Sequence, residues 1–323
     1  MKNILVTGGA GYIGSHIAEI LLKKKFNVFI VDNLSTGYKK LINKRSKFYK
    51  IDITNFKKLK KIIDINKIDT VIHLAASISI NNSQKNPKLF HKNNVVGTKI
   101  LVKSCKNSHV KNFIFSSTAA VYKDTTKKVK ESAPIKPKSI YGKTKIIAEK
   151  IIIKEFKKQK INYAILRYFN VVGASSNNKI GPLKKNDTLF KNLAMSLFKK
   201  KPLMLIYGNK FNTKDGTCVR DYIHVSDLSN LHFLILKKIE KIKKSVILNC
   251  GYGSGISVLK AVNSFIKYSK KKVIIQYKNK RPGDLASSTA NNQKLKKFIS
   301  WKPKYNNLKK IVLSCIKWEK KLN

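Results

Sequence analysis

The chain has 323 residues, of which 42% are hydrophobic, and this is enough to bury one large core or two lobes that share a cleft. The formal charge of +53 suggests nucleic-acid binding, but only four of the 69 basic residues are arginine, the residue that binds phosphate through two parallel hydrogen bonds. We therefore interpret the scattered lysines as solvated surface that binds polyanions only non-specifically, with no specific nucleic acid as partner. No apolar run approaches the ~20 residues that a membrane helix needs, so we expect no membrane contact.

Short apolar runs alternate with helical patterns along the first half of the chain. Strands are predicted at residues 4–6, 27–31, 48–51, 70–74, 112–115 and 163–166, and helices begin near Tyr12, Asn55, Pro87 and Ser139. This alternation is typical of an α/β fold with a doubly wound parallel sheet, as in Rossmann domains. After about residue 174 the pattern loosens into a loop at 175–185, a helix at 188–199 and shorter elements.

Two lobes follow from this change of pattern. We expect a Rossmann domain over residues 1–173 and a smaller α/β lobe over residues 174–323 that binds the substrate. A return of segments after about residue 217 to the first domain stays open.

The four cysteines, Cys105, Cys218, Cys250 and Cys315, lie far apart and form no CxxC pair. We expect reduced structural thiols rather than a disulfide or zinc framework, and no metal site. The chain enters a predicted strand directly, without the pattern of a signal peptide, so we expect a cytoplasmic protein.

Gly8, Gly11 and Gly14 follow the first predicted strand and open the first helix. Glycines at this spacing permit a tight turn, close approach of the backbone to a pyrophosphate and close packing of helix on strand. Asp32 ends the next strand, eighteen residues after Gly14. Its carboxylate would accept a hydrogen bond from the adenosine 2′-hydroxyl and repel a 2′-phosphate, so NAD is preferred to NADP. A simple turn residue is the other interpretation of Asp32.

Tyr141 and Lys145 are four residues apart and would lie on one face of a helix. The ammonium group would favour the phenolate and lower the pKa of the tyrosine from its usual value near 10. Such a tyrosine can take a proton from an alcohol while a nicotinamide takes the hydride. Thr118 follows the strand predicted at 112–115, at the carboxyl edge of the sheet beside the cofactor. A helix-surface tyrosine and a strand-end threonine are the structural alternatives.

The ordered set of motifs resembles the extended short-chain dehydrogenase/reductases, and within them the UDP-galactose (UDP-glucose) 4-epimerase group. The matching segments include TGGAGYIGSH, DNLS, HLAAS, NNVVGT, SSTAAVY, YGKTK, RYFNVVGA and DGTCVRDYIHVSDL, and the likeness covers effectively the whole chain. It implies 4-epimerisation of a UDP-hexose through a 4-keto sugar, with NAD as cofactor. Tyr141 would be the acid/base, Lys145 would bind the nicotinamide ribose, and Thr118 would hydrogen-bond the reacting hydroxyl.

The resemblance also implies the binding residues. Those expected to hold NAD are Gly8, Gly11, Tyr12, Ile13, Gly14, Asp32, Asn33, Asp52, Ile53, Leu74, Ala75, Ala76, Asn93, Tyr141, Lys145 and Phe169. Those expected to hold the UDP-sugar are Thr118, Asn170, Leu189, Tyr207, Arg220, Arg281, Asp284 and Ser288. In this group the two arginines grip the diphosphate, the tyrosine lies beside the uracil and the aspartate takes the ribose hydroxyls. Strand core is the other interpretation of Leu74 and Ala75, and His224 is expected to be structural.

Several positions depart from the pattern of the galactose enzymes. Ile78 stands where they commonly place a lysine, and Thr188 stands where an asparagine is expected, which indicates a relative of the galactose enzyme. Ser288 replaces a bulky tyrosine at the wall of the sugar pocket and leaves room for a 2-acetamido group. Thr118 is followed by two alanines, whereas dehydratases of this fold carry an Asp-Glu pair there, so dehydration is disfavoured.

The leading hypothesis is therefore a UDP-hexose 4-epimerase that uses UDP-glucose and UDP-galactose, with their N-acetyl forms open. The alternatives are another NAD-dependent nucleotide-sugar reductase or modifier, a non-catalytic NAD-binding regulator, or a polyanion-binding protein. The presence of Tyr141, Lys145 and Thr118 argues against the regulator. Helices near residues 87–108 and 139–158 are expected to form the contact of a homodimer, as in the family.

Overall fold

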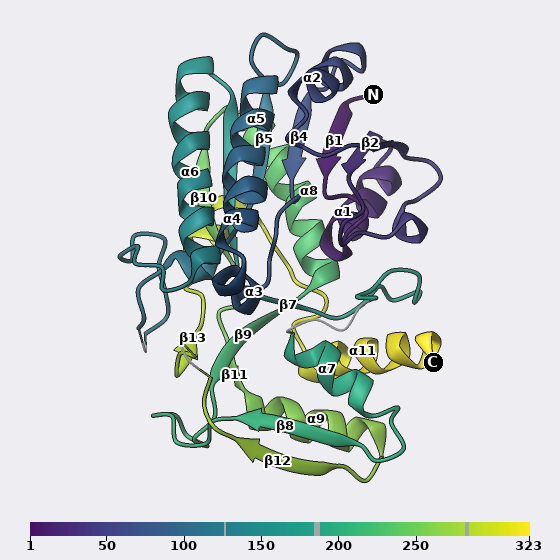
Figure 1. Ribbon diagram of the computed structural model, residues 1–323, viewed down its shortest axis with the longest axis vertical. Helices are drawn as coiled ribbons and strands as arrows, with labels where there is room; N and C mark the ends of the chain where they lie inside the picture. The colour runs from purple at the N-terminus through teal and green to yellow at the C-terminus, as the bar shows by residue number, and fades with distance from the viewer. Residues whose placement is uncertain (126, 184–187, 282–283) are drawn as a thin grey trace.

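A parallel sheet of seven strands forms the centre of the larger part of the molecule (Figure 1). The structure is a computed structural model that describes residues 1–125, 127–183, 188–281 and 284–323. The sheet has the strand order β10-β6-β5-β4-β1-β2-β3, and every neighbouring pair is parallel. Its strands are β1 (Asn3–Thr7), β2 (Asn27–Asp32), β3 (Lys47–Lys50), β4 (Thr70–His73), β5 (Asn112–Thr118), β6 (Asn162–Tyr168) and β10 (Val246–Cys250).

Helices cover both faces of this sheet, and two hydrophobic cores result. Ile4 and Val6 of β1 pack in one core with α1 (Tyr12–Lys23) and α8 (Val225–Ile242). Leu5, which points to the opposite face, packs in the other core with α2 (Phe56–Ile65), α5 (Gly97–Ser104) and α6 (Ile140–Gln159). Because both faces of the sheet are buried, most of its strands are largely apolar, and the sequence pattern located six of the seven. β10, which follows elements of the smaller part in the chain, was not among the predicted strands.

The predicted strands are all present, and the differences lie at their ends. β5 runs three residues beyond its predicted end, because Ser116, Ser117 and Thr118 pair with β6 although their side chains are polar. The helices predicted near Asn55 and Ser139 begin directly after those residues, whose side chains cap α2 and α6 by accepting backbone N–H groups.

The helix predicted near residue 87 is broken into several pieces. These are α3 (Ile80–Lys85), α4 (Pro87–Phe90), a π-helical segment η2 (His91–Val96) and α5. Short 3₁₀ turns occur at η1 (Lys39–Leu41) and η3 (Ala119–Val121). Segments of π-helix are rare and are often found at functional sites.

The remaining elements form the smaller part at the bottom of Figure 1. β7 (Asn170–Val172), β9 (Val219–His224), β11 (Gly255–Ser257) and β13 (Ser287–Ser288) share one small sheet, and β8 (Leu203–Tyr207) pairs with β12 (Ile274–Lys278). Its helices include α7 (Leu189–Ser196), α9 (Val258–Ser269) and α11 (Leu308–Leu322), whereas α10 (Gln293–Phe298) contacts β10 of the central sheet. Residues 175–183 form the expected loop without helix or strand, and residues 184 and 185 of that prediction lie outside the described residues.

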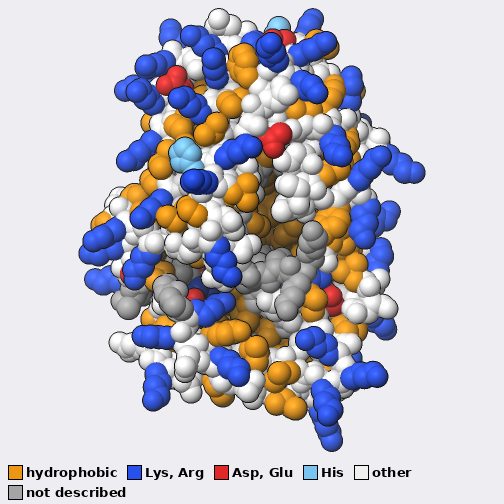
Figure 2. All heavy atoms as spheres, viewed as in Figure 1, with side chains coloured by type: hydrophobic (Ala, Val, Ile, Leu, Met, Phe, Trp, Pro, Cys, Tyr) orange, Lys and Arg blue, Asp and Glu red, His pale blue; other side chains and the backbone are white. Residues whose placement is uncertain are grey.

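Lysines dominate the outer surface. Figure 2 shows the blue basic side chains spread over the whole visible face, with few acidic side chains between them. The four cysteines are buried and free. Over the described residues, no helix is long and apolar enough to cross a membrane, and no group of His, Cys, Asp and Glu side chains could hold a metal ion.

Phe113 is the clearest test of the core between the sheet and α6. Its side chain is fully buried, with the rings of His73 and Phe156 at 6.0 and 4.8 Å. Phe113→Ala should lower the free energy of unfolding by about 3–5 kcal/mol, because it removes buried surface and leaves a cavity. Ile65→Ala, at a side chain that is 66% exposed on α2, should change it by less than about 0.5 kcal/mol. Urea denaturation measures both, and equal effects would contradict this description of the core.

Candidate active site

The turn between β1 and α1 is packed so closely that its glycines cannot be replaced without movement. Gly8 has a φ of +73°, and a Cβ atom added there would lie 2.6 Å from the backbone nitrogen of Ala75. A Cβ atom on Gly14 would lie 2.2 Å from the carbonyl oxygen of Gly8. Gly11 is the N-cap residue of α1 and has no side chain, so no side-chain oxygen at the cap accepts the first N–H groups of the helix. This arrangement fits a pyrophosphate group.

Asp32 lies beside this turn at the end of β2. Its carboxylate accepts the backbone N–H groups of Ala10 at 3.0 Å and Leu34 at 2.8 Å, so it also holds the glycine turn in place. Burial raises the pKa of Asp32, and these two hydrogen bonds oppose the rise. Asn33 follows directly and donates to the Asp52 carboxylate at 2.8 Å.

The other residues expected to hold NAD continue along the same edge of the sheet. The backbone N–H of Leu74 bonds to Thr7 O at 3.0 Å, and Asn93 donates to Ser77 Oγ at 2.9 Å. Leu74 is also partly buried against the hydrophobic core, as the alternative interpretation of strand core expects. The hydroxyl of Tyr12 donates to Gly173 O at 2.6 Å, and Ile53 packs against Gly97. Ala75 is half-buried beside Gly8, and Phe169 is buried. Ile13 and Ala76 adjoin these residues in the chain.

Tyr141, Lys145 and Thr118 meet where α6 crosses the carboxyl end of β5. The side chains of Tyr141 and Thr118 form a hydrogen bond. One helical turn further on, Lys145 Nζ donates to the carbonyl oxygen of Ser116 at 2.8 Å and lies 4.8 Å from the centre of the Phe115 ring. The three residues singled out in the sequence therefore form one cluster.

The electrostatics of this cluster differ from the expectation. Burial raises the pKa of Tyr141 to about 12, although the hydrogen bond from Thr118 opposes the rise. Burial lowers the pKa of Lys145 to about 7, against the opposing charge of Glu149. The sequence predicted a lowered pKa for Tyr141. That prediction is wrong for this arrangement, because the effect of burial on the pKa outweighs that of the hydrogen bond from Thr118.

A second cluster gathers in the smaller part of the molecule. Arg220 on β9 donates to two backbone carbonyl groups at 2.7 and 2.9 Å, and its Nη2 lies 3.9 Å from Asp284 Oδ1. Arg281 pairs with Asp284 at 3.0 Å, and its guanidinium lies 5.0 Å from the centre of the Tyr207 ring. Four of the residues expected to bind the nucleotide are thus brought together.

Strand pairing joins the two clusters. Thr118 pairs with Tyr168 at the end of β6, two residues before Asn170 opens β7. β7 lies beside β9, and Ser288 of β13 pairs with Arg220. The amide of Asn170 donates to the carbonyl oxygen of Asp221 at 3.2 Å. The structure gives Leu189 at the start of α7, packed partly into the core of the smaller part.

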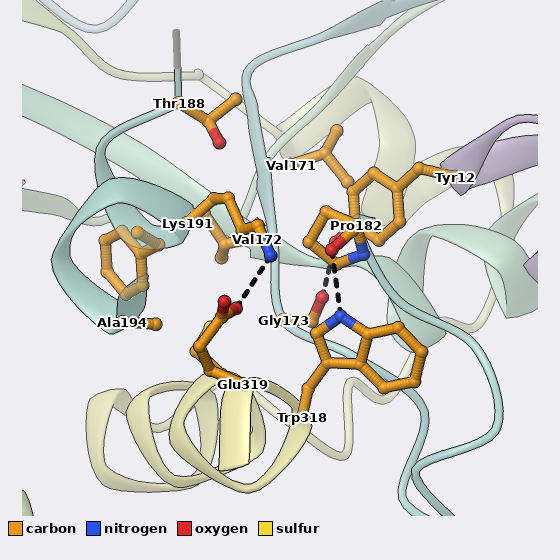
Figure 3. Close-up of a pocket in the computed structure, with 12 residues that line it drawn as sticks. Tyr12, Val171, Val172, Gly173, Pro182, Thr188, Lys191, Ala194, Trp318 and Glu319 are labelled. Atoms are coloured by element: carbon orange, nitrogen blue, oxygen red, sulfur yellow. Dashed lines mark hydrogen bonds and ion pairs between the residues drawn. The ribbon is translucent and has the colours of Figure 1, made fainter. Parts of the chain in front are cut away.

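A small cavity lies beside these clusters, between α7, α11 and the loop that precedes residue 183 (Figure 3). Tyr12, Pro182, Trp318 and the buried ion pair Lys191–Glu319 line it, and its volume of about 20 Å³ accommodates a water molecule. Tyr141, Lys145 and Thr118 are not among its lining residues. It is therefore a packing feature behind the site rather than the reaction chamber.

Two buried carboxylates at the site were given no role by the sequence analysis. Asp221 accepts three backbone N–H groups at 2.8 to 3.2 Å and so fixes the strand that carries Arg220. Glu149 binds Arg167 from the helix that carries Tyr141 and Lys145. Its position four residues after Lys145 was the available signal, since it continues the same helix face.

His224 has the structural role expected of it. Its ring stacks on Tyr305 at 4.1 Å, it accepts the backbone N–H of Ser226 at the start of α8, and burial lowers its pKa to about 3. Ile78, the departure from the lysine of related enzymes, is 69% exposed.

Comparisons with known proteins identify the family of the chain. A family model described as the NAD dependent epimerase/dehydratase family matches residues 4–251. A UDP-glucose 4-epimerase of Lactobacillus helveticus is 38% identical over 98% of this chain and 97% of its own length.

Solved structures match over the same extent. A UDP-glucose 4-epimerase from Stenotrophomonas maltophila with bound NAD and formylated UDP-arabinopyranose superimposes with a TM-score of 0.96 at 32% identity, covering 100% of this chain and 99% of the other. The UDP-Glc/GlcNAc 4-epimerase of Campylobacter jejuni gives a TM-score of 0.87 at 35% identity, over 99% of this chain and 100% of the other. The chain therefore belongs to the NAD dependent epimerase/dehydratase family.

Proposed function

We propose that this protein is an NAD-dependent UDP-hexose 4-epimerase that interconverts UDP-glucose and UDP-galactose. The observation that carries the proposal is the cluster in which Tyr141 is hydrogen-bonded to Thr118, with Lys145 one turn further along the same helix. The full-length likeness to UDP-glucose 4-epimerases supports it. The reaction is redox-neutral, so it needs no second reductant.

Each residue of the cluster has one task in this reaction. Tyr141 takes the proton from the 4-hydroxyl of the sugar at its phenolic oxygen and returns it after the sugar has turned over. Thr118 holds the same hydroxyl through a hydrogen bond, and Lys145 binds the nicotinamide ribose and favours the phenolate of Tyr141. When bound, NAD supplies the reversible hydride transfer at C4 that passes through a 4-keto sugar.

The glycine turn is proposed to hold the pyrophosphate of NAD. Gly8, Gly11 and Gly14 leave the backbone bare at the start of α1, where N–H groups and the helix dipole favour an anion. In this proposal Asp32 binds the adenosine ribose and disfavours the additional phosphate of NADP. In this proposal the cofactor site is completed by residues 74–76, by Asn93 and by the other residues that the sequence analysis expects to hold NAD.

The second cluster is proposed to bind the UDP moiety. Two guanidinium groups beside one aromatic ring suit a diphosphate and a uracil, since arginine offers two parallel donors to each phosphate. Asn170, Leu189 and Ser288 complete this site in the proposal.

Three wider features belong to the same proposal. The chain forms a cofactor domain over residues 1–173, to which α8 and β10 return, and a nucleotide-sugar lobe over the rest of residues 174–323, works in the cytoplasm, and acts as a homodimer. Exposed Leu89 on α4 and Ile147 on α6, which are 51% and 40% accessible, support a contact between copies through these neighbouring helices.

Tyr141→Phe tests the acid/base. The change keeps the ring and removes the oxygen that transfers the proton, so turnover should fall by ~100-fold or more while bound NAD is retained. Purified protein is incubated with UDP-galactose without added reductant, and the product is separated by chromatography. Tyr163→Phe, at a half-buried tyrosine on β6, is the matched control. Turnover near that of the wild type in Tyr141→Phe would exclude Tyr141 as the base.

Arg281→Lys tests the diphosphate site. Lysine keeps the charge and loses the forked donors, so UDP should bind about 10- to 100-fold more weakly by calorimetry. Lys296→Ala, at an exposed lysine on α10, should leave the affinity unchanged within about twofold. Equal small effects of both changes would mean that the affinity for UDP comes only from diffuse charge.

Ser288 tests the breadth of the substrate range. A serine at the pocket wall leaves space for an acetamido group, and a buried amide needs hydrogen-bond partners because an unpaired one costs about 1–3 kcal/mol. We expect UDP-N-acetylglucosamine and UDP-N-acetylgalactosamine to be interconverted at least comparably to the non-acetylated pair. Ser288→Tyr should suppress the acetylated reaction and spare UDP-galactose. If the wild type ignores acetylated sugars and Ser288→Tyr changes neither rate, Ser288 does not bound the pocket.

A further inference from the structure

Helix α6 holds β5 through three side chains that lie one helical turn apart. Tyr141 bonds to the side chain of Thr118, Lys145 donates to the backbone carbonyl of Ser116, and Ser117 Oγ donates to Glu149. The three helix residues are spaced by four and lie on one face. They meet three consecutive residues of the strand, so the position of the helix along β5 is fixed at every turn.

Glu149 is also bound from the opposite side. Arg167 on β6 donates to its carboxylate from Nε at 3.0 Å and from Nη2 at 2.6 Å, and the two side chains are 1% and 5% exposed. Arg167 Nη1 donates to the Tyr122 hydroxyl at 2.9 Å, and that hydroxyl donates to Asn249 on β10 at 2.7 Å. The network thus connects α6 with three strands of the sheet.

Stability alone does not explain such a network. Burying two charges removes them from water, and well-packed apolar residues of similar size are often as stabilising as a buried ion pair. A buried pair is therefore more informative where one of its charges acts on a third group. Glu149 lies one turn from Lys145, and its charge raises the pKa of that lysine against the effect of burial.

Among the titratable groups around Lys145, Glu149 is the one whose charge favours the ammonium form of the lysine. The titratable groups that face it, directly or through a neighbour, are Tyr141 and Glu149 on α6, His73 on β4, and Arg167 and Tyr168 on β6. Burial lowers the pKa of His73 to about 3, so its ring is neutral, and both ring nitrogens are partnered by Thr7 and Thr98. Burial raises the pKa of Tyr168 well above its usual range, so it is also neutral. Among these groups, only Glu149 brings a negative charge to Lys145 near neutral pH.

We propose that Glu149 is a positioning residue of this active site, which fixes α6 on β5 through Ser117 and retains the ammonium form of Lys145 as its counter-charge. The proposal rests on the roles proposed above for Tyr141 and Lys145. Glu149 itself touches neither substrate nor cofactor in it and acts only through its neighbours. Arg167 holds the carboxylate in the orientation that this requires.

Glu149→Gln tests the charge. Loss of a neighbouring carboxylate should lower the pKa of Lys145 by about one unit. Because the starting pKa is about 7, the protonated fraction then falls about fivefold at pH 7 and about tenfold at pH 8. We expect kcat for UDP-galactose to fall by these factors, with KM and bound NAD nearly unchanged. The limb of the pH–rate profile that reports Lys145 should move to lower pH by about one unit.

Three further variants separate charge from packing. Glu149→Gln with Arg167→Met removes both charges and keeps the volume, so it should fold as the wild type does. Its limb should shift in the same direction by less, because the positive charge of Arg167 is also gone. Glu149→Asp keeps the charge, so its limb should stay near that of the wild type while kcat falls from the loosened contact with Ser117. Glu155→Gln makes the same charge change further along α6 and should alter neither quantity.

The outcomes distinguish this proposal from the proposed function. If Glu149→Gln and the double variant lose only stability and keep the wild-type pH profile, Glu149 is merely structural and the proposal is overturned. If the wild type does not epimerise any UDP-sugar, the proposed function fails instead. The pKa of Lys145 is then followed by NMR on ¹³Cε-labelled lysine, through the resonance that Lys145→Arg removes. An unchanged pKa in Glu149→Gln would again overturn the role of Glu149.

Discussion

All seven strands of the central sheet run in the same direction, and the positions of the functional side chains depend on that alignment. Parallel strands end at one edge, so Thr7, Asp32, His73, Thr118 and Tyr168 come together although they are far apart in the sequence. The same alignment obliges each connection to cross a face of the sheet, and α6 therefore lies across β5. Tyr141 and Lys145 reach the strand ends because the helix that carries them has to cover that face.

The sequence was most informative where burial leaves a simple pattern. The apolar runs located six of the seven central strands, and Asn55 and Ser139 marked two helix starts because their side chains cap those helices. The end of β5 was missed, since Ser116 and Ser117 look like loop residues until their partners on other elements are known. In the smaller part, β8 is buried only at alternate residues and β12 is mostly exposed, so burial does not set these strands apart as it does in the central sheet.

The candidate site was predictable as a set of residues and much less as an electrostatic arrangement. Motif spacing identified Tyr141, Lys145 and Thr118, and the structure brings them into one cluster. The direction of the Tyr141 pKa shift depends on how deeply its hydroxyl is buried, which spacing cannot reveal. The Glu149–Arg167 pair was equally inaccessible, because its two members lie on different elements and only their packing makes them partners.

Asp284 bridges the two arginines of the nucleotide cluster, and this has a consequence for anion selectivity. An anionic ligand that binds these guanidinium groups has to displace the Asp284 carboxylate. Its affinity is therefore the difference between its own contacts with the arginines and the contacts that Asp284 loses. A ligand with a single charge gains little from such an exchange. One with two adjacent charges can satisfy both guanidinium groups at once and leave the carboxylate free to accept hydroxyl donors. As the proposed diphosphate site, the cluster would therefore discriminate between anions by their valence, and not only by their shape.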